Sequence, residues 1–205
     1  IVFQQSIFSR KGTDRILKYA FDLAQRRPKK HLTSATKSNG ISITMPYWDE
    51  RVSAMAQHYP DVKWDKYHID ILSAHFVQHP DWFDVVVASN LFGDILSDEA
   101  AMLVGSLGML PSASLAPDGK GLYEPIHGSA PDIAGKDIVN PCAMILSAAM
   151  MLRHSFNRDK DAQRIENAVR AVVGRGLRTA DIMDTDSRLV GTKEMGDAIA
   201  AAVVG

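Results

Sequence analysis

The stretch FDVVVASNLFGDILSDEAAM, residues 83–102, decides the fold. Near its start is a run of three β-branched residues, Val85 to Val87, which lies between Asp84 and Ala88. A continuous apolar run of this kind predicts a strand buried on both faces, as in a parallel sheet. A segment of small and apolar residues that resembles a buried helix follows directly. A strand that leads into a helix in this way favours an α/β fold.

Strand and helix patterns alternate along the rest of the chain, which supports the same class. The sequence predicts strands at 31–36, 62–69 and 83–90, and helices at 13–27, with Thr13 as N-cap, at 45–60 and at 70–80. Residues 111–141 are rich in glycine and proline, so we expect loops and short strands there. Three helices should finish the chain, at about 140–156, 161–173 and 192–203, the first capped by Asn140.

Composition narrows the class of protein. The 205 residues are 46% hydrophobic and 23% charged, with a formal net charge of −1, which suits a globular unit and gives no support to nucleic-acid binding. No apolar run is long enough to span a membrane. The single cysteine, Cys142, excludes an internal disulfide and fits a reducing compartment, so we expect a cytoplasmic protein. The start at Ile1, without methionine, suggests a truncated chain.

Asp94 and Asp98 are the first candidates for chemistry. On a helix, positions i and i+4 point the same way, and two like charges at that spacing repel each other. A cation between them would remove the repulsion. Carboxylates without cysteine or histidine beside them favour a hard ion, Mg²⁺ or Mn²⁺. The alternative is that Asp94 caps the helix and Asp98 faces water, and the spacing alone favours this alternative.

The segment HGSAPDIAGK, residues 127–136, is a candidate for ligand binding. Its small residues would allow the backbone to approach a ligand closely, and Pro131 could open a short helix whose N–H groups face a phosphate. Asp132 could accept hydrogen bonds from ribose hydroxyls. The sequence contains no GxGxxG motif, and an ordinary glycine-rich turn is the alternative.

Four further positions carry weaker signals. Lys37 follows a predicted strand and could act in proton transfer if its neighbours depress its pKa. His75 and His79 have the i, i+4 spacing of a zinc pair, but the glutamate of the HExxH motif is absent, so a helix surface is favoured. Cys142 follows a helix N-terminus, which would lower the pKa of its thiol, although a small buried side chain is the favoured interpretation.

Four segments taken together, in chain order, resemble one family. TKSNG, NLFGDILSDEAAM, GSLGMLPSASL and GLYEPIHGSAPDIAGKDIVNP look like the β-decarboxylating dehydrogenases, which include isopropylmalate, isocitrate, D-malate and tartrate dehydrogenases. The resemblance covers nearly the whole chain and matches the C-terminal part of the family. It implies a two-domain open α/β fold whose N-terminal part is missing. Residues 1–106 would belong to the central dimer-forming and catalytic domain, and 107–205 to the C-terminal half of the cofactor-binding domain.

The resemblance also implies a reaction and a site. The reaction is the oxidative decarboxylation of a 2-hydroxy acid with NAD and Mg²⁺ or Mn²⁺. Asp94 and Asp98 match metal ligands of one subunit, and Asp70 matches the aspartate that the partner subunit contributes. Lys37 matches the catalytic lysine, also from the partner subunit, which helps to remove the proton of the substrate hydroxyl. The active site would therefore be shared across a homodimer.

The cofactor positions follow by the same resemblance. Asn39 matches a residue near the nicotinamide. The family's cofactor loop is matched by Glu124, His127, Gly128, Ser129, Ala130, Asp132, Ile133 and Asn140. Members that prefer NADP usually carry a basic residue and then a tyrosine at the positions of Asp132 and Ile133. Because an aspartate accepts hydrogen bonds from free ribose hydroxyls and repels a 2′-phosphate, we predict NAD.

The two halves of the chain predict different substrates. Segments 33–52 and 66–80 look most like tartrate and D-malate dehydrogenases, in which a serine, here Ser38, replaces the alanine that usually follows the lysine in isopropylmalate dehydrogenases. Segments 97–115 and 192–203 look more like isopropylmalate dehydrogenase. The balance leans slightly to 3-isopropylmalate and leucine biosynthesis, with D-malate or tartrate as the alternative. A non-catalytic regulatory subunit is the alternative of another class. It would be expected to have lost some of the lysine and aspartate positions, all of which are present.

Overall fold

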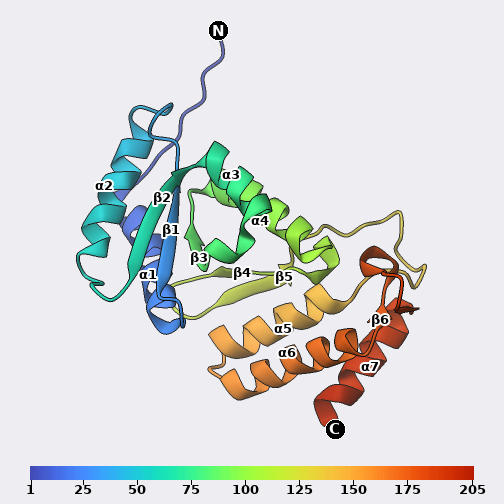
Figure 1. The fold of residues 1–205 in the computed structure, drawn as a ribbon. Helices are drawn as coiled ribbons and strands as arrows, with labels where there is room; N and C mark the ends of the chain where they lie inside the picture. The colour runs from blue at the N-terminus through green and yellow to red at the C-terminus, as the bar shows by residue number, and fades with distance from the viewer. The chain divides into compact units, whose positions relative to one another are not determined.

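The computed structural model describes residues 1–205 as two compact units, Ile1–Ala100 and Ala101–Gly205. Strands and helices alternate in the first unit, and helices predominate in the second (Figure 1). The predicted α/β class is therefore confirmed. The roles that the resemblance gives to residues 1–106 and 107–205 stay predictions.

The first unit contains a parallel three-stranded sheet in the order β2-β1-β3. The central strand β1 (His31–Thr36) pairs with β2 (Lys63–His68) on one side and with β3 (Val85–Val87) on the other. All residues of β1 after His31 are buried, which is the pattern expected of a parallel strand with both faces covered. The strand predicted from the valine run is thus confirmed as part of a parallel sheet.

Helices complete the first unit (Figure 1). Helix α1 (Arg10–Arg26) packs against α2 (Thr44–Ala56), β1 and β3, whereas α3 (Ile69–Gln78) contacts β1 and β2. A short 3₁₀ helix η1 (Pro80–Trp82) precedes β3, and α4 (Asn90–Val104) follows it. The main hydrophobic core gathers buried side chains from α1, β1, α2 and β3, among them Leu17, Phe21, Leu32, Trp48 and Val85.

The N-cap of helix α1 lies four residues earlier than the sequence predicted. Ser9 is the N-cap, and its hydroxyl accepts a hydrogen bond from the Gly12 backbone N–H at 3.1 Å. Thr13, the predicted N-cap, lies inside the helix and is 5% exposed. Both residues are good capping types, and Thr13 stays helical because its position faces the core.

The second unit combines an antiparallel hairpin with three helices. Strand β4 (Pro111–Leu115) pairs with β5 (Gly121–Pro125), and α5 (Cys142–His154) packs on both. Helix α6 (Asp159–Gly174) lies between α5 and α7 (Thr192–Val204). Short elements are η2 (Leu107–Met109), η3 (Ala180–Ile182) and the parallel pair β6 (Leu177–Arg178) and β7 (Arg188–Leu189).

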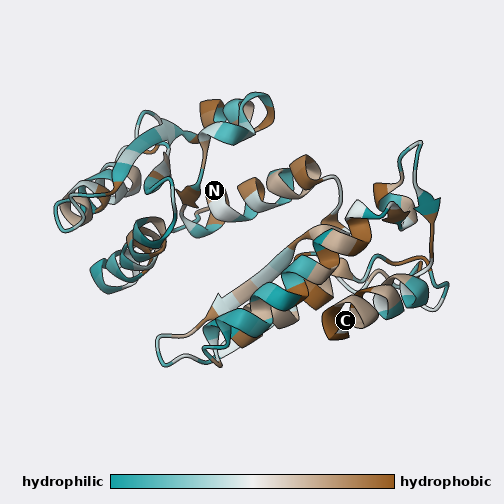
Figure 2. Cartoon of the chain, turned by 60° about the horizontal axis from the view of Figure 1, so that its bottom comes forward, coloured by the Kyte–Doolittle hydropathy of each residue, from teal (hydrophilic) through white to brown (hydrophobic).

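The helices of both units mix hydrophobic and hydrophilic residues along their length, as amphipathic helices do (Figure 2). In the second unit the apolar faces enclose their own core, which contains Cys142, Val169, Val172, Met195 and Ile199. No helix in the structure combines the length and apolar character that crossing a membrane requires.

We predict that Trp48 is a main contributor to the stability of the first unit. Its side chain is 2% exposed and its indole N–H donates to Ser34 Oγ of β1 at 2.9 Å. Trp48→Phe would leave a cavity and a buried hydroxyl without its donor, and should lower the free energy of unfolding by roughly 2–4 kcal/mol. Trp82, 46% exposed, provides the control. Chemical denaturation of Trp82→Phe should show a loss below about 1 kcal/mol, and equal losses would contradict the assignment.

Candidate functional site

The parallel sheet places the carboxyl ends of three strands at one edge. The register pairs Thr36 of β1 with His68 of β2, so the chain leaves these two strands side by side. Lys37 follows β1 directly, and Asp70 lies in the first turn of α3 after β2. Sites in open α/β sheets form at this edge, where the loops that follow adjacent strands meet.

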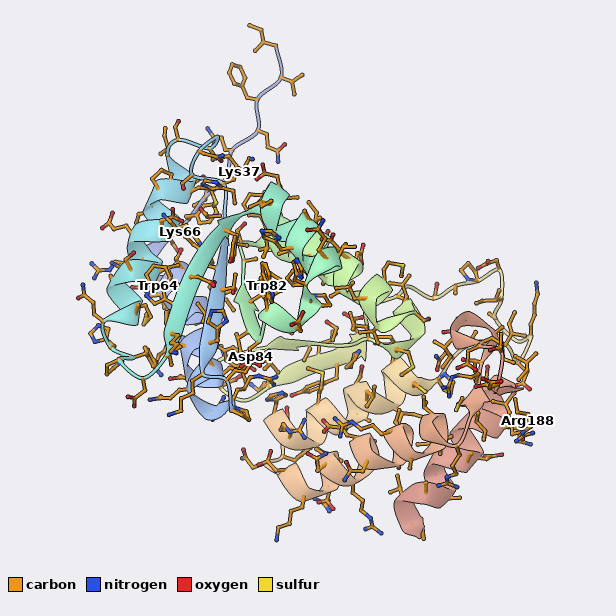
Figure 3. All side chains as sticks on the ribbon, viewed as in Figure 1. Lys37, Trp64, Lys66, Trp82, Asp84 and Arg188 are labelled. Carbon is orange, nitrogen blue, oxygen red and sulfur yellow. The ribbon has the colours of Figure 1, made fainter.

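Lys37 and Asp70 form an ion pair at this edge. Lys37 Nζ lies 2.9 Å from Asp70 Oδ1, and the lysine side chain is 29% exposed. Figure 3 labels Lys37, which follows the end of β1. The hydrogen bond from Lys37 holds the pKa of Asp70 below its ordinary value, assisted by backbone N–H groups at the start of α3. Lys37 and Asp70 are both candidates from sequence, but their pairing within one chain is seen only in the structure. Their catalytic and metal-binding roles stay predictions.

Asp94 and Asp98 lie on α4, the helix that follows β3. Both are exposed, and neither carboxylate forms an ion pair or a side-chain hydrogen bond. The alternative in which Asp94 caps the helix is wrong, because α4 begins at Asn90 and Asp94 lies one turn inside it. Two carboxylates without protein partners, one helical turn apart, have the donor chemistry that Mg²⁺ or Mn²⁺ takes.

A metal ion at Asp94 and Asp98 would need ligands beyond these two. Within the chain no group of three or more His, Cys, Asp or Glu side chains is placed to hold a metal ion. The third predicted ligand, Asp70, is paired with Lys37 in the same chain. The donors therefore fit a divalent ion only if the ligand set is completed from outside this chain. This is compatible with the predicted contribution of Asp70 of the partner subunit.

The segment after Lys37 is a tight turn. The backbone N–H groups of Gly40 and Ile41 both donate to the Lys37 carbonyl oxygen, at 2.9 Å and 2.8 Å. Asn39 is exposed in this turn, so its side chain is accessible to a ligand. The turn links the catalytic candidate Lys37 and the cofactor candidate Asn39 in one short rigid segment.

The predicted cofactor loop begins at the end of β5, where Glu124 lies, and continues as turns to Asn140. The short helix expected at Pro131 is absent. Ala130 has a positive φ of 44°, and its carbonyl accepts from the N–H groups of Ile133 and Ala134 at 3.1 Å and 3.2 Å. The segment closes as successive turns because the left-handed residue comes at its start. Asp132 is exposed there, with no hydrogen bond or ion pair of its own.

The other predicted loop residues lie near these turns. The His127 ring nitrogen Nδ1 is 2.8 Å from the Gly128 carbonyl oxygen. The carbonyl accepts a hydrogen bond from the ring when Nδ1 carries the proton. Gly128 and Ser129 are exposed, and Ile133 is half-buried. Exposed backbone at small residues suits a ligand that approaches closely, but contact of these residues with a cofactor stays a prediction.

The far end of the loop is fixed to the N-terminus of α7. The Asp137 carbonyl accepts from the Thr192 N–H at 3.0 Å, and its carboxylate accepts from the Lys193 N–H at 2.8 Å. The Thr192 hydroxyl donates to the Val139 carbonyl at 2.5 Å. A carboxylate at a helix N-terminus satisfies free N–H groups and interacts favourably with the helix dipole. This contact restrains the loop that carries the predicted cofactor residues.

Asn140 has a structural role that its predicted cofactor role does not require. Its Oδ1 accepts from the Cys142 N–H at 3.0 Å. The predicted N-cap is nevertheless wrong by one residue, because α5 begins at Cys142 and Pro141 is its N-cap. Its Nδ2 donates to Asp181 Oδ2 at 3.0 Å. With Asn140 only 4% exposed, cofactor binding through its side chain stays a prediction.

The Asp181 carboxylate joins several segments of the second unit, and nothing in the sequence marked it. It accepts hydrogen bonds from Ser106, Thr179 and Asn140. Burial would raise its pKa, but these hydrogen bonds together hold the pKa below its ordinary value. Gly108 leaves room for Asn140 beside Asp181, because a Cβ at position 108 would lie 2.7 Å from the Asn140 Cβ. No local motif marks Asp181, since Asn140 lies 41 residues away.

The cysteine and the two histidines with weak signals resolve as structural. Cys142 is fully buried, and burial, assisted by the charge of Asp181, raises the pKa of its thiol to about 11. The lowering by the helix N-terminus that the sequence suggested is therefore wrong. His79 stacks on Trp82, with ring centroids 4.0 Å apart, and His75 also contacts that ring. The favoured non-metal interpretation of the two histidines is consistent with this aromatic cluster.

Comparison with known proteins identifies the family. The model of the isocitrate/isopropylmalate dehydrogenase family matches residues 2–199, and this chain belongs to that family. Its relatives include a D-malate dehydrogenase [decarboxylating] of Escherichia coli (strain K12), 53% identical over all of this chain and 57% of the relative. A tartrate dehydrogenase/decarboxylase of Pseudomonas putida is 56% identical over 97% of this chain and 55% of the relative.

Two further proteins are similar to this chain, one in sequence and one in solved structure. A 3-isopropylmalate dehydrogenase of Synechococcus sp. (strain JA-3-3Ab) is 52% identical over 96% of this chain and 51% of its own length. The crystal structure of isocitrate dehydrogenase from Methylococcus capsulatus superposes with a TM-score of 0.91 at 44% identity, covering 98% of this chain and 58% of that one. The chain thus spans about half the length of the curated relatives. The resemblance and the fold predicted from sequence are confirmed.

We predict opposite effects for two glycine substitutions near α7. A Cβ on Gly191 would lie 2.6 Å from the Asp137 carbonyl oxygen, whereas nothing lies within 4 Å of a Cβ on Gly196. Gly191→Ala should therefore displace the loop and lower the free energy of unfolding by about 1–3 kcal/mol. Gly196→Ala, inside α7, should raise it by about 0.5–1 kcal/mol. Urea denaturation measures both, and a neutral Gly191→Ala would show that the loop does not need this close approach.

We predict that the Cys142 thiol is unreactive in the folded protein. With a pKa of about 11, only about one thiol in a thousand is ionised at pH 8, and the buried sulfur excludes reagent. An aromatic disulfide reagent at pH 8 should modify Cys142 only after unfolding in guanidinium, which serves as the positive control. Rapid stoichiometric reaction of the native protein would contradict both the burial and the raised pKa.

Proposed function

We propose that the protein catalyses the metal-dependent, NAD-linked oxidative decarboxylation of a 2-hydroxy dicarboxylic acid. The observation that supports this most strongly is the arrangement at the sheet edge. The Lys37–Asp70 ion pair lies where β1 and β2 end, and α4, which follows β3, carries the exposed pair Asp94 and Asp98. Membership of the isocitrate/isopropylmalate dehydrogenase family agrees with this chemistry.

Lys37 is the group that we propose to move a proton. Its ammonium lies at the end of a buried strand and is held by Asp70 at 2.9 Å, so its position is defined before substrate arrives. As the amine, Lys37 would accept the proton of the substrate hydroxyl while the C2 hydrogen leaves. Asp70 would then stabilise the ammonium that forms. When bound, the divalent ion would polarise the hydroxyl oxygen and the nicotinamide would accept the hydride.

Asp94 and Asp98 would hold the divalent ion, with Asp70 of the partner subunit completing the ligands. We propose a homodimer for this reason, because the chain alone supplies no group of three ligands. The turns from His127 to Asn140 would bind the cofactor, with Asp132 accepting from the ribose hydroxyls of NAD. The exposure of Asp132 and its lack of a protein partner support that assignment.

We propose D-malate or tartrate as the first substrates to test. Ser38, which resembles the tartrate and D-malate branch, lies next to Lys37 and is structurally engaged, because its hydroxyl donates to Asp49 at 2.8 Å. The second candidate is 3-isopropylmalate, towards which the sequence analysis leaned. It is favoured by the motifs at 97–115 and 192–203 and by isopropylmalate dehydrogenases among the relatives. Identities of 52–56% to the relatives with these three substrates leave this choice to experiment.

We predict that Asp94→Asn in the complete protein lowers metal-dependent turnover at least about a hundredfold, because an amide is a poor substitute for a charged ligand. The reaction is followed as NADH formation with Mg²⁺ or Mn²⁺, offering D-malate, tartrate and 3-isopropylmalate in parallel. Half-maximal activity should also require a higher metal concentration. Folding should be unaffected, since the Asp94 carboxylate is exposed.

Asp197→Asn is the matched control, because Asp197 is an exposed helical aspartate on α7, outside the proposed ligand set. It should retain full turnover. Undiminished turnover in Asp94→Asn would contradict the metal assignment. Absence of NADH formation with all three substrates in the unaltered complete protein would instead favour the non-catalytic alternative.

A further inference from the structure

The turn that carries Lys37 is held from outside by an aspartate on α2. The Ser38 hydroxyl donates to Asp49 Oδ2 at 2.8 Å, and Lys66 Nζ of β2 lies 2.8 Å from the same oxygen. Asp49 thereby links three elements: α2, the turn after β1, and β2. Asp49 and Lys66 lie in the segments 33–52 and 66–80 that resemble tartrate and D-malate dehydrogenases, but no role follows for either residue from sequence.

Burial makes this contact more than a surface ion pair. The Asp49 side chain is 12% exposed, whereas that of Lys66 is 48% exposed. Burial alone would raise the pKa of Asp49, but hydrogen bonds from Lys66 and Ser38 and the charge of Lys66 hold the pKa below its ordinary value. The Thr36 hydroxyl also lowers the pKa of Asp49, although the two groups do not form a hydrogen bond of normal geometry. The carboxylate is therefore ionised and held by directed partners.

Helix α2 is itself fixed to the sheet at the neighbouring residue. Trp48, buried in the core, donates its indole N–H to Ser34 Oγ in the middle of β1. Arg51, one turn further on, forms two hydrogen bonds to Asp14 of α1, at 2.8 Å and 3.1 Å. Asp49 is thus presented from a helix that cannot easily shift. A fixed carboxylate can restrain the turn in a way that a mobile one cannot.

We propose that Asp49 is a positioning residue, which fixes the turn of Lys37 and Asn39 by accepting from Ser38 while Lys66 holds its carboxylate. The catalytic part of this inference rests on the proposed function, whereas the restraint on the turn does not. The path is short: Ser38 is the residue after Lys37, and Gly40 and Ile41 close the turn on the Lys37 carbonyl. Release of Ser38 would let the Lys37 backbone move and weaken its alignment with Asp70.

The first test measures the turn without any substrate. Amide hydrogen exchange at Gly40 and Ile41 reports the two hydrogen bonds to the Lys37 carbonyl. In the complete protein, Ser38→Ala and Asp49→Asn should each accelerate exchange at these two amides by at least about fivefold, while the rest of the first unit is unchanged. Ser38→Ala keeps the Asp49–Lys66 pair, so it tests the restraint even if Asp49→Asn folds poorly.

The second test measures turnover with whichever substrate the unaltered protein accepts. Ser38→Ala and Asp49→Asn should lower kcat by about tenfold to a hundredfold, with a change in substrate KM below about threefold. Adding Ser38→Ala to Asp49→Asn should cause little further loss, because both remove one contact. Asp49→Glu, which keeps a carboxylate, should recover part of kcat. Ser53→Ala is the matched control, since Ser53 donates only to the Asp49 backbone carbonyl.

Three results would overturn the proposal. One is unchanged exchange at Gly40 and Ile41 in both variants, whatever the activity. Another is accelerated exchange with unchanged kcat, which would reduce Asp49 to a structural contact. The third is a loss of kcat in Ser53→Ala as large as in Ser38→Ala. An unaltered protein without turnover would refute the proposed function, and the exchange experiment would still decide whether Asp49 restrains the turn.

Discussion

The pairing of β1 with a parallel neighbour on each side is the constraint on which the first unit depends. Because β2 and β3 run in the same direction as β1 and on opposite sides of it, all three strands end at one edge. Lys37, Asp70 and helix α4 follow those ends in the chain. The buried side chains of β1 and Trp48 of α2 fix the register, since a shift of one residue would move Leu32 and Ser34 to the opposite face of the sheet and separate Ser34 from Trp48. The candidate site is therefore a consequence of strand direction and register.

Local chemistry was enough to predict the elements. The valine run at 85–87, the proline in the first turn of α2 and the hydrogen bond that Asn140 accepts from the Cys142 N–H each act over a few residues. Errors occurred where two local signals compete. Ser9 and Thr13 both suit an N-cap, and only the burial of Thr13 in the core decides between them. At Pro131 the sequence allowed either a short helix or an ordinary glycine-rich turn, and the structure has turns that follow Ala130 with its positive φ.

The candidate residues of the site were found in sequence mainly through resemblance to a family, and the contacts between them were not. The Lys37–Asp70 pair spans 33 residues of sequence, and no periodicity connects its members. The same holds for Asp49 with Ser38, Asp137 with α7, and Asp181 with Asn140. In each case a single carboxylate joins segments distant in sequence, and such a residue looks locally like any solvated aspartate. The sequence marked Ser38 as a difference between the tartrate and D-malate dehydrogenases and the isopropylmalate dehydrogenases, but it did not mark Asp49, to which Ser38 donates.

The central claim is that Lys37 and Asp70 of one copy act with Asp94 and Asp98 of another, and mixing two inactive variants of the complete protein tests it most directly. Lys37→Met and Asp94→Asn are each expected to be inactive alone. If the site is shared, unfolding and refolding them together in equal amounts gives mixed dimers with one intact site. Random reassortment should then restore about a quarter of the activity of the unaltered protein. No activity above that of the separate variants, with mixed dimers demonstrated by mass, would contradict the shared site.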